Sequence, residues 1–343
     1  MQNKQILKVI GELGFVEIYK NGKIQITPPV MNVHQTRMEP FVQFLVDYKR
    51  LNPDFRFQGY FTLYDAWREH AEPSENPEFA LCTTKQLRQY VGTGSIGEQG
   101  RFMQPYHLKD LFPVFNRNVL AFGRHSNDPF TLLIPDTDFI TSHGYKELRK
   151  HIDDSDLSWE QKYPRLYWRG APHGFPYRAY DPENISSQRK LLLKFSNQLP
   201  TICDAAFSCT TQKKEMLGYK YLIDIDGEVN AWSGLFWKLY SGSVVFKVES
   251  HYEQWYYSDI SPWVHYVPVK GDLSDLHDRF EWALQNDEAC RHIAENGKKF
   301  ATWLTYDNVV SVFKIENDID LLQNRRDMLV STMSRRGRQE QFC

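Results

Sequence analysis

A strand–helix–strand pattern in the second half of the chain constrains the fold most. The apolar run Lys220-Tyr-Leu-Ile-Asp-Ile-Asp-Gly227 ends in an Asp-Gly turn, Ser233-Gly234 opens a helical pattern, and Ser243–Val248 is a second β-branched run. This order predicts a βαβ unit. Because the start of a helix leaves backbone N–H groups unpaired, an anionic ligand such as phosphate could bind beside these small residues. The pattern therefore predicts a nucleotide site in an α/β domain.

The first half of the chain also alternates between strand and helix patterns. Residues 1–30 contain short apolar runs around a glycine, which predict a small strand or hairpin, and residues 38–51 have helical spacing. Buried strands are predicted over 55–63, 114–122 and 130–134. Asp65 lies two residues beyond the first of these three strands, at the carboxyl end where open α/β sheets place ligand-binding residues, so it is a functional candidate.

The elements predicted after residue 140 complete an α/β pattern. They are a charged helix over 145–157, strands over 166–168 and 264–269, a helix starting at 187–193, and helices over 287–305 and 306–322. A further helix has Leu273, Leu276, Phe280 and Ala283 on one face, and Asp272 is its predicted N-cap.

The length of 343 residues favours two domains. Tyr163-Pro164 is a plausible crossing between them, so the predicted organisation is 1–160, 161–310 and a C-terminal helix with a basic tail over 311–343 that packs back on the first domain. The tail carries arginines at 325, 326, 335, 336 and 338. Such a tail could contact an anionic membrane surface, or could simply be solvated.

Composition excludes some classes of protein. A formal net charge of −2 lacks the basic field of a general nucleic-acid binder. Aromatic residues make up 15% of the chain, which fits either a sugar-binding cleft or an aromatic-rich core. The five cysteines form no Cys-x-x-Cys pair, and neither a signal-peptide core nor an 18-residue apolar window is present. We therefore expect a cytoplasmic protein.

Several short motifs have both a functional and an ordinary interpretation. Gly92-Thr-Gly-Ser-Ile-Gly97 has the letters of a dinucleotide fingerprint, but it follows a helical pattern and is better interpreted as a loop. Asp136-Thr-Asp138 and Asp224-Ile-Asp226 have a spacing that can hold a divalent metal on a nucleotide diphosphate, yet acidic residues at turns give the same spacing. His173 and His265 could be bases or structural histidines.

Two arginines are better candidates for an anionic ligand. Arg169 follows a strand and precedes Gly170, and Arg189 enters the first turn of a predicted helix. A guanidinium group matches the oxygens of a diphosphate, although either side chain could be an ordinary surface arginine.

Five segments, in this order and spacing, resemble glycosyltransferase family 90, which includes protein O-glucosyltransferases, fungal xylosyltransferases and bacterial lipopolysaccharide-modifying enzymes. They are Tyr167-Trp-Arg-Gly170, Ser187-Gln-Arg189, Lys220–Gly227, Ser241–Ser250 and Pro262–Leu273. The first half is similar more loosely, through Phe61-Thr-Leu-Tyr-Asp65 and Phe122-Gly-Arg-His125.

The resemblance implies a GT-B architecture, in which two Rossmann-like domains face each other across a cleft. It implies inverting, metal-independent transfer of a sugar from a UDP-sugar, without a cofactor. Because no signal peptide is predicted, we expect a glycan or lipid-linked glycan of the cell envelope, such as lipopolysaccharide core, as the acceptor. Asp65 matches the catalytic base of the family. The residues expected on the donor side are Arg169, Gly170, Arg189, Asp226, Gly227, Ser233, Gly234, Lys238 and Glu249.

One position departs from the family pattern. Many relatives have an arginine two residues before the position of Lys238, where this chain has Phe236. We therefore expect the diphosphate to depend more on Arg189, on the backbone near Ser233 and on Lys238. The departure also permits one alternative, a carbohydrate-binding protein without activity. A second alternative, a metal-dependent transferase, would use Asp224 and Asp226.

Overall fold

The computed structural model describes most of the chain as two compact units. The described residues are 13–29, 35–63, 118–126, 131–155, 157–171, 188–208, 213–227, 230–250, 252–313 and 315. Unit 1 comprises Met1–Pro135 with Val310–Cys343, and unit 2 comprises Asp136–Val309. This division begins the second unit earlier than the expected boundary at 161, and the predicted domain limits stay predictions.

Unit 1 is built on a mixed five-stranded sheet of order β2-β1-β3-β4-β6. Its elements are β1 (Leu13–Ile18), β2 (Ile24–Thr27), the 3₁₀ helix η1 (Gln35–Arg37), α2 (Met38–Leu51), β3 (Phe57–Thr62), β4 (Val119–Ala121), β5 (Gly123–His125) and β6 (Thr131–Leu133). Strand β1 is antiparallel to β2 and β3, while β3, β4 and β6 are parallel. The predicted N-terminal hairpin is confirmed.

Helix α2 forms because its apolar residues recur every three or four positions. Phe41, Phe44, Leu45 and Tyr48 are buried on one face, and the helix has the predicted bounds. Phe41 stacks on Phe61 of β3 with ring centroids 4.4 Å apart. The N–H of Ile315 donates to the Tyr48 hydroxyl at 3.2 Å, so residue 315 packs on α2 within this unit.

Unit 2 contains an all-parallel five-stranded sheet of order β12-β10-β9-β7-β8. Its elements up to the end of β9 are α5 (Thr137–Thr141), α6 (Lys146–Asp153), η3 (Trp159–Gln161), β7 (Tyr163–Gly170), α7 (Gln188–Gln198), β8 (Cys203–Phe207), α8 (Lys213–Met216) and β9 (Tyr219–Asp224). The remaining elements are α9 (Gly234–Tyr240), β10 (Val244–Val248), β11 (Tyr252–Gln254), η4 (Tyr257–Asp259), β12 (Val267–Val269), α10 (Leu276–Gln285), α11 (Asp287–Trp303) and α12 (Tyr306–Val312), whose last residues belong to unit 1. The opening βαβ prediction is confirmed by β9, α9 and β10.

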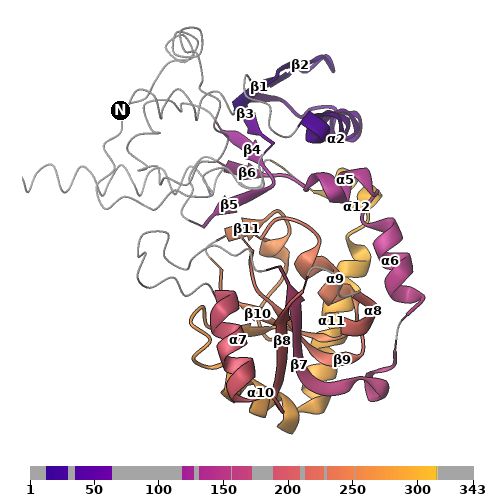
Figure 1. Ribbon diagram of the computed structural model, residues 1–343. Helices are drawn as coiled ribbons and strands as arrows, with labels where there is room; N and C mark the ends of the chain where they lie inside the picture. Colours follow the sequence, from indigo (N-terminus) through magenta and orange to yellow (C-terminus); the bar gives the residue numbers. More distant parts are fainter. Residues whose placement is uncertain are drawn as a thin grey trace, which may run out of the picture. The chain divides into compact units, whose positions relative to one another are not determined.

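Helices cover both faces of this parallel sheet. Figure 1 shows α7 and α10 along one face and α9 along the other. Trp168, Ile223 and Phe246 contribute alternate strand residues to the core on the α7 and α10 side, where Leu192 and Phe280 pack against them. Such double coverage accounts for the near-continuous apolar character of β9 and β10.

The strand order of unit 2 contains a topological switch point. In sequence order the strands are β7, β8, β9, β10 and β12, and β8 lies on one side of β7 while β9, β10 and β12 follow on the other. The chain therefore reverses its direction of winding between β7 and β9. Open parallel sheets bind ligands at the carboxyl ends of the two strands that flank such a point.

One predicted helix start is wrong. Asp272 does not cap α10; its carboxylate accepts the N–H of Ser274 in a turn, and the N-cap position is Asp275. Leu273 has φ +60°, and a left-handed residue interrupts the helical path before α10 can begin. The apolar face was nevertheless predicted correctly, since Leu276, Phe280 and Ala283 are buried.

No helix in the described parts of the chain combines the length and the apolar character that a membrane crossing would require.

Candidate functional site

Arg189 lies at the switch point and joins the ends of β7 and β9. Its Nε donates to the carbonyl of Asp226 at 2.9 Å, and its Nη1 donates to the carbonyl of Ala171 at 2.8 Å. The guanidinium carbon is 5.4 Å from the ring centroid of Trp168. Burial lowers the pKa of Arg189, but the group stays charged because an arginine pKa starts so high. The edge where a parallel sheet binds ligands thus holds a fixed cation.

The residue before Arg189 ties α7 to the neighbouring loops. Gln188 donates through Nε2 to the carbonyl of Glu249 at 3.0 Å and to that of Gly271 at 3.1 Å. The carboxylate of Glu249 also accepts the N–H of Gly271 at 3.3 Å. Glu249 is therefore at the same edge of the sheet as Arg189. Gln188 was not predicted as a site residue, although it stands inside the Ser-Gln-Arg motif.

Asp224 and Asp226 are two positions apart in sequence and have different partners. The Asp224 carboxylate is buried and accepts from Lys238 Nζ at 2.6 Å. Asp226 is half-buried and accepts a hydrogen bond from the Ser250 hydroxyl. Burial raises the pKa of Asp226, while the positive charge of Lys247 opposes that rise. Lys238 is thus directed at Asp224.

The segment before α9 has an unusual backbone. Trp232 has φ +90°, a conformation that is strained for a bulky side chain, and Ser233 and Gly234 follow it directly. A Cβ atom added to Gly234 would meet no other atom within 4 Å, so the space beside it is open. Helix α9 has only seven residues, so its dipole is a weak source of positive charge. Gly227 lies at the other end of this loop.

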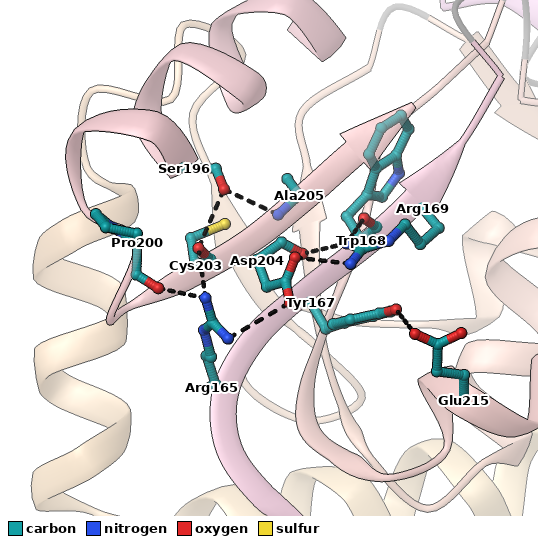
Figure 2. Close-up of polar contacts among 10 residues, drawn as sticks. All are labelled: Arg165, Tyr167, Trp168, Arg169, Ser196, Pro200, Cys203, Asp204, Ala205 and Glu215. Carbon is teal, nitrogen blue, oxygen red and sulfur yellow. Dashed lines mark hydrogen bonds and ion pairs between the residues drawn. The ribbon is translucent and has the colours of Figure 1, made fainter. Parts of the chain in front are cut away.

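Arg169 belongs to a separate polar cluster, drawn in Figure 2. Its Nη2 is 2.7 Å from a carboxylate oxygen of Asp204 on β8, and its guanidinium carbon is 4.3 Å from the Tyr167 ring centroid. Arg165 approaches the other oxygen of Asp204 at 3.4 Å, and the Tyr167 hydroxyl donates to Glu215 at 2.8 Å. Arg169 is thus paired with Asp204. Arg189 instead contacts Trp168, the residue directly before Arg169 on β7.

Gly170 has a packing reason to be glycine. A Cβ atom at this position would lie 2.5 Å from the Trp168 indole. The absence of a side chain therefore leaves room for the ring that faces Arg189.

Phe236 is buried in an aromatic cluster. Its ring centroid is 4.6 Å from that of Tyr145, and the guanidinium carbon of Arg149 on α6 lies 4.7 Å from it. Arg149 is held by the carbonyls of Gly144 at 2.8 Å and Leu304 at 2.7 Å. The side chain at 236 therefore packs between helices and contributes no charge to the switch point.

The remaining candidates from the sequence fall into two groups. Asp65, His173 and the glycine-rich loop 92–97 lie outside the described residues, as does the basic tail. His265 accepts the N–H of Ser261 at 3.0 Å through Nδ1, and burial lowers its pKa, which fits a structural histidine. Within the described ranges, no cluster of three or more His, Cys, Asp or Glu side chains could hold a metal ion.

Asp136 of the first Asp-x-Asp motif is the N-cap of α5. It accepts the N–H of Phe139 at 3.0 Å and the hydroxyl of Tyr145 at 2.6 Å. Burial raises the pKa of its carboxyl group from 3.8 to about 6, because these hydrogen bonds only partly offset the loss of solvent. This aspartate has a structural role.

We expect Asp136 to make folding stability depend on pH. Its folded pKa lies above its unfolded value, so the folded state binds the proton more tightly. Below about pH 4, Asp136 therefore contributes up to about 3 kcal/mol to the free energy of unfolding. This stabilisation is lost as the pH rises to about 6. Urea unfolding between pH 4 and 7 should show a steeper decline for the wild type than for Asp136→Asn. The exposed neighbour Asp138 provides the control variant Asp138→Asn, and equal slopes for Asp136→Asn and wild type would contradict the expectation.

Relatives of this chain include named glucosyltransferases. It is 31% identical over 207 residues to Protein O-glucosyltransferase 2 of Danio rerio, covering 54% of this chain and 39% of the relative. It is 31% identical over 159 residues to human Protein O-glucosyltransferase 3, covering 42% and 29%. Protein 035R of Invertebrate iridescent virus 3 is 44% identical over 84 residues, covering 24% and 8%. The chain thus spans less than half the length of these relatives.

Solved structures show only distant similarity. Anabaena HepE, crystallised in complex with UDP-glucose, aligns with a TM-score of 0.31 and 9% identity, over 74% of this chain and 64% of that one. Sucrose-phosphate synthase from Thermosynechococcus elongatus gives a TM-score of 0.31 and 10% identity, over 87% and 64%. TM-scores this low do not establish a common fold.

A sequence profile defines the family. The profile of glycosyl transferase family 90 matches residues 128–332, more than half of the chain. The match includes β7, α7, β9 and β10, whose ends form the switch point. The resemblance noted in the sequence is therefore confirmed, and this chain belongs to glycosyltransferase family 90.

Proposed function

We propose that this chain is an inverting, metal-independent glycosyltransferase that moves a sugar such as glucose or xylose from a UDP-sugar to a hydroxyl group. The observation that carries the proposal is the position of Arg189, a fixed guanidinium at the switch point of a parallel sheet. Family membership and the names of the glucosyltransferase relatives support the reaction type.

The donor would bind along the carboxyl edge of β7, β9 and β10. Its diphosphate would lie near Arg189, Gly227 and the open space beside Gly234. The strained backbone at Trp232 supports this placement, because such strain is concentrated at ligand sites. Three other expected donor-side residues would stabilise the structure of this edge without contacting the diphosphate. Arg169 does so through Asp204, Lys238 through Asp224, and Glu249 through Gly271.

The proposed reaction is a single displacement. The acceptor oxygen forms a bond to the anomeric carbon as the bond from that carbon to the phosphate oxygen breaks, and the electron pair leaves with UDP. Asp65 accepts the proton of the acceptor hydroxyl, which is the role of a general base. Positive charge at the donor edge stabilises the leaving diphosphate, so the reaction needs neither a metal nor a cofactor.

We propose that the two units are the Rossmann-like domains of a GT-B enzyme, with unit 1 on the acceptor side. Each unit has a sheet that contains at least three consecutive parallel strands, which supports this assignment. The names of the relatives favour a hydroxyl group on a protein as acceptor, and a lipopolysaccharide core or another lipid-linked glycan is the second candidate. If the acceptor is a lipid-linked glycan, the protein would be in the cytoplasm and its basic tail would contact a membrane.

A thermal-shift screen tests the donor. A ligand that binds only the folded state raises the unfolding temperature with occupancy, so UDP and one or more UDP-sugars should raise it and ADP, GDP and TDP should not. A screen without any shift from uridine nucleotides would overturn the proposal.

The two alternative functions give different outcomes in an activity assay. A carbohydrate-binding protein without activity would release no UDP from any UDP-sugar. A metal-dependent transferase using Asp224 and Asp226 would lose activity in a chelator. Asp224 is already bound to Lys238, so we expect UDP release to be unchanged in EDTA.

Replacing Arg189 with alanine should weaken UDP binding by about 10- to 100-fold, since charge-assisted hydrogen bonds contribute about 1.5–3 kcal/mol. Calorimetric titration of UDP measures the change. Arg291 on α11 is exposed and provides the control Arg291→Ala, which should bind UDP like the wild type. Unchanged affinity in Arg189→Ala would remove this residue from the donor site.

A further inference from the structure

Lys247 is a buried cation at the same edge of the sheet. It lies near the carboxyl end of β10 and is only 8% exposed. In the parallel register it stands opposite Asp224 of β9, while its neighbour Phe246 belongs to the core on the α7 and α10 side. Because strand side chains alternate, Lys247 projects from the face that carries α9.

The ammonium of Lys247 has no hydrogen-bond acceptor or ion-pair partner among the described residues. Its closest recorded contact is the ring of Tyr257, whose centroid is 4.6 Å from Nζ. The carboxylate of Asp226 attracts the Lys247 ammonium but forms no ion pair with it. This carboxylate accepts a hydrogen bond from the Ser250 hydroxyl. A buried ammonium is costly unless an anion compensates it. The position is therefore suited to an anion that arrives with a ligand.

The other cations near this edge are already engaged. Lys238 is bound to Asp224 and Arg169 to Asp204, while Arg189 donates to two backbone carbonyls. Phe236 supplies no charge, and α9 is too short for a strong dipole. A diphosphate would need more positive charge than Arg189 alone provides.

We propose that Lys247 binds the diphosphate of the nucleotide sugar and stabilises its negative charge as it leaves. This inference rests on the proposed function and adds a residue to the donor site. The Tyr257 ring holds the ammonium in place, and Asp226 attracts it toward the carboxyl edge of the sheet. Lys247 would contact the phosphates and leave uridine to other groups.

Titration calorimetry with UDP and with uridine tests this assignment. Lys247→Met should weaken UDP binding by at least about tenfold, a fold-change equal to about 1.4 kcal/mol, and leave uridine binding unchanged. Lys270, an exposed lysine directly after β12, provides the control Lys270→Met, which should bind both ligands like the wild type. Lys247→Gln keeps a polar end of similar length, and it replaces Lys247→Met if the methionine variant does not fold.

The outcomes separate this inference from the proposed function. If the wild type binds UDP and either folded Lys247 variant binds it equally well, Lys247 does not bind the diphosphate, although the transferase proposal stands. An equal loss of uridine and UDP affinity would show a structural role for Lys247 and would also overturn the inference. If the wild type does not bind UDP at all, the proposed function fails.

Discussion

Replacing Asp65 with asparagine should lower sugar transfer by about 10²–10⁴-fold, the usual contribution of a general base. Asparagine has nearly the same shape as aspartate but cannot accept the proton of the acceptor hydroxyl. UDP affinity should stay close to that of the wild type, because all residues of the proposed donor site belong to unit 2. The measurements are the rate of UDP release with acceptor present and calorimetric titration of UDP.

The control for Asp65→Asn is Asp54→Asn, which makes the same change at an exposed aspartate of unit 1. It should have wild-type activity and affinity. Wild-type turnover by Asp65→Asn would show that another group accepts the proton, whereas a parallel loss of UDP affinity would show that Asp65 acts in donor binding.

Lys238→Met should have the largest effect on stability. The change leaves the buried Asp224 carboxylate without its ammonium partner, and removing one member of a buried ion pair costs about 3–5 kcal/mol. Urea unfolding at pH 7 measures the loss. The double variant Asp224→Asn with Lys238→Met should regain much of it, because no uncompensated charge stays buried.

Lys220→Met provides the matched control. Lys220 also contacts a carboxylate at 2.7 Å, but its partner Asp287 is 53% exposed. The loss there should be about 0–1 kcal/mol. If Lys238→Met were as mild as this control, the Lys238–Asp224 pair would not hold the carboxyl end of β9.

The sequence predicted elements with strong periodicity well. Helix α2 was predicted with its observed bounds because its buried residues repeat at helical spacing. The βαβ unit was found because β9 and β10 are apolar on both faces and are bounded by turns. Strand β7 was predicted too short, since Pro164 and Arg165 interrupt the apolar pattern near its start. The cap of α10 was misplaced because nothing in the sequence marks the left-handed Leu273.

The site was predicted only in part, because the partners of its charged groups depend on strand register. The sequence identified Arg189 as a candidate, and the structure places it at the switch point. It could not show that Asp204 of β8 pairs with Arg169, or that Lys238 reaches back to Asp224. Lys247 was inside a motif that had been noted, but its lack of a described partner depends on the packing around β10.

Photolabelling tests the central claim, that a UDP-sugar binds at the carboxyl edge of β7 and β9. A photoreactive UDP-glucose analogue is crosslinked to the wild-type protein with and without excess UDP, and the labelled peptides are identified by mass spectrometry. The account predicts UDP-protected labelling of peptides that contain Arg189 or the segment from Asp226 to Gly234. UDP-protected labelling confined to the β1–β2 hairpin or α2 of unit 1 would contradict it.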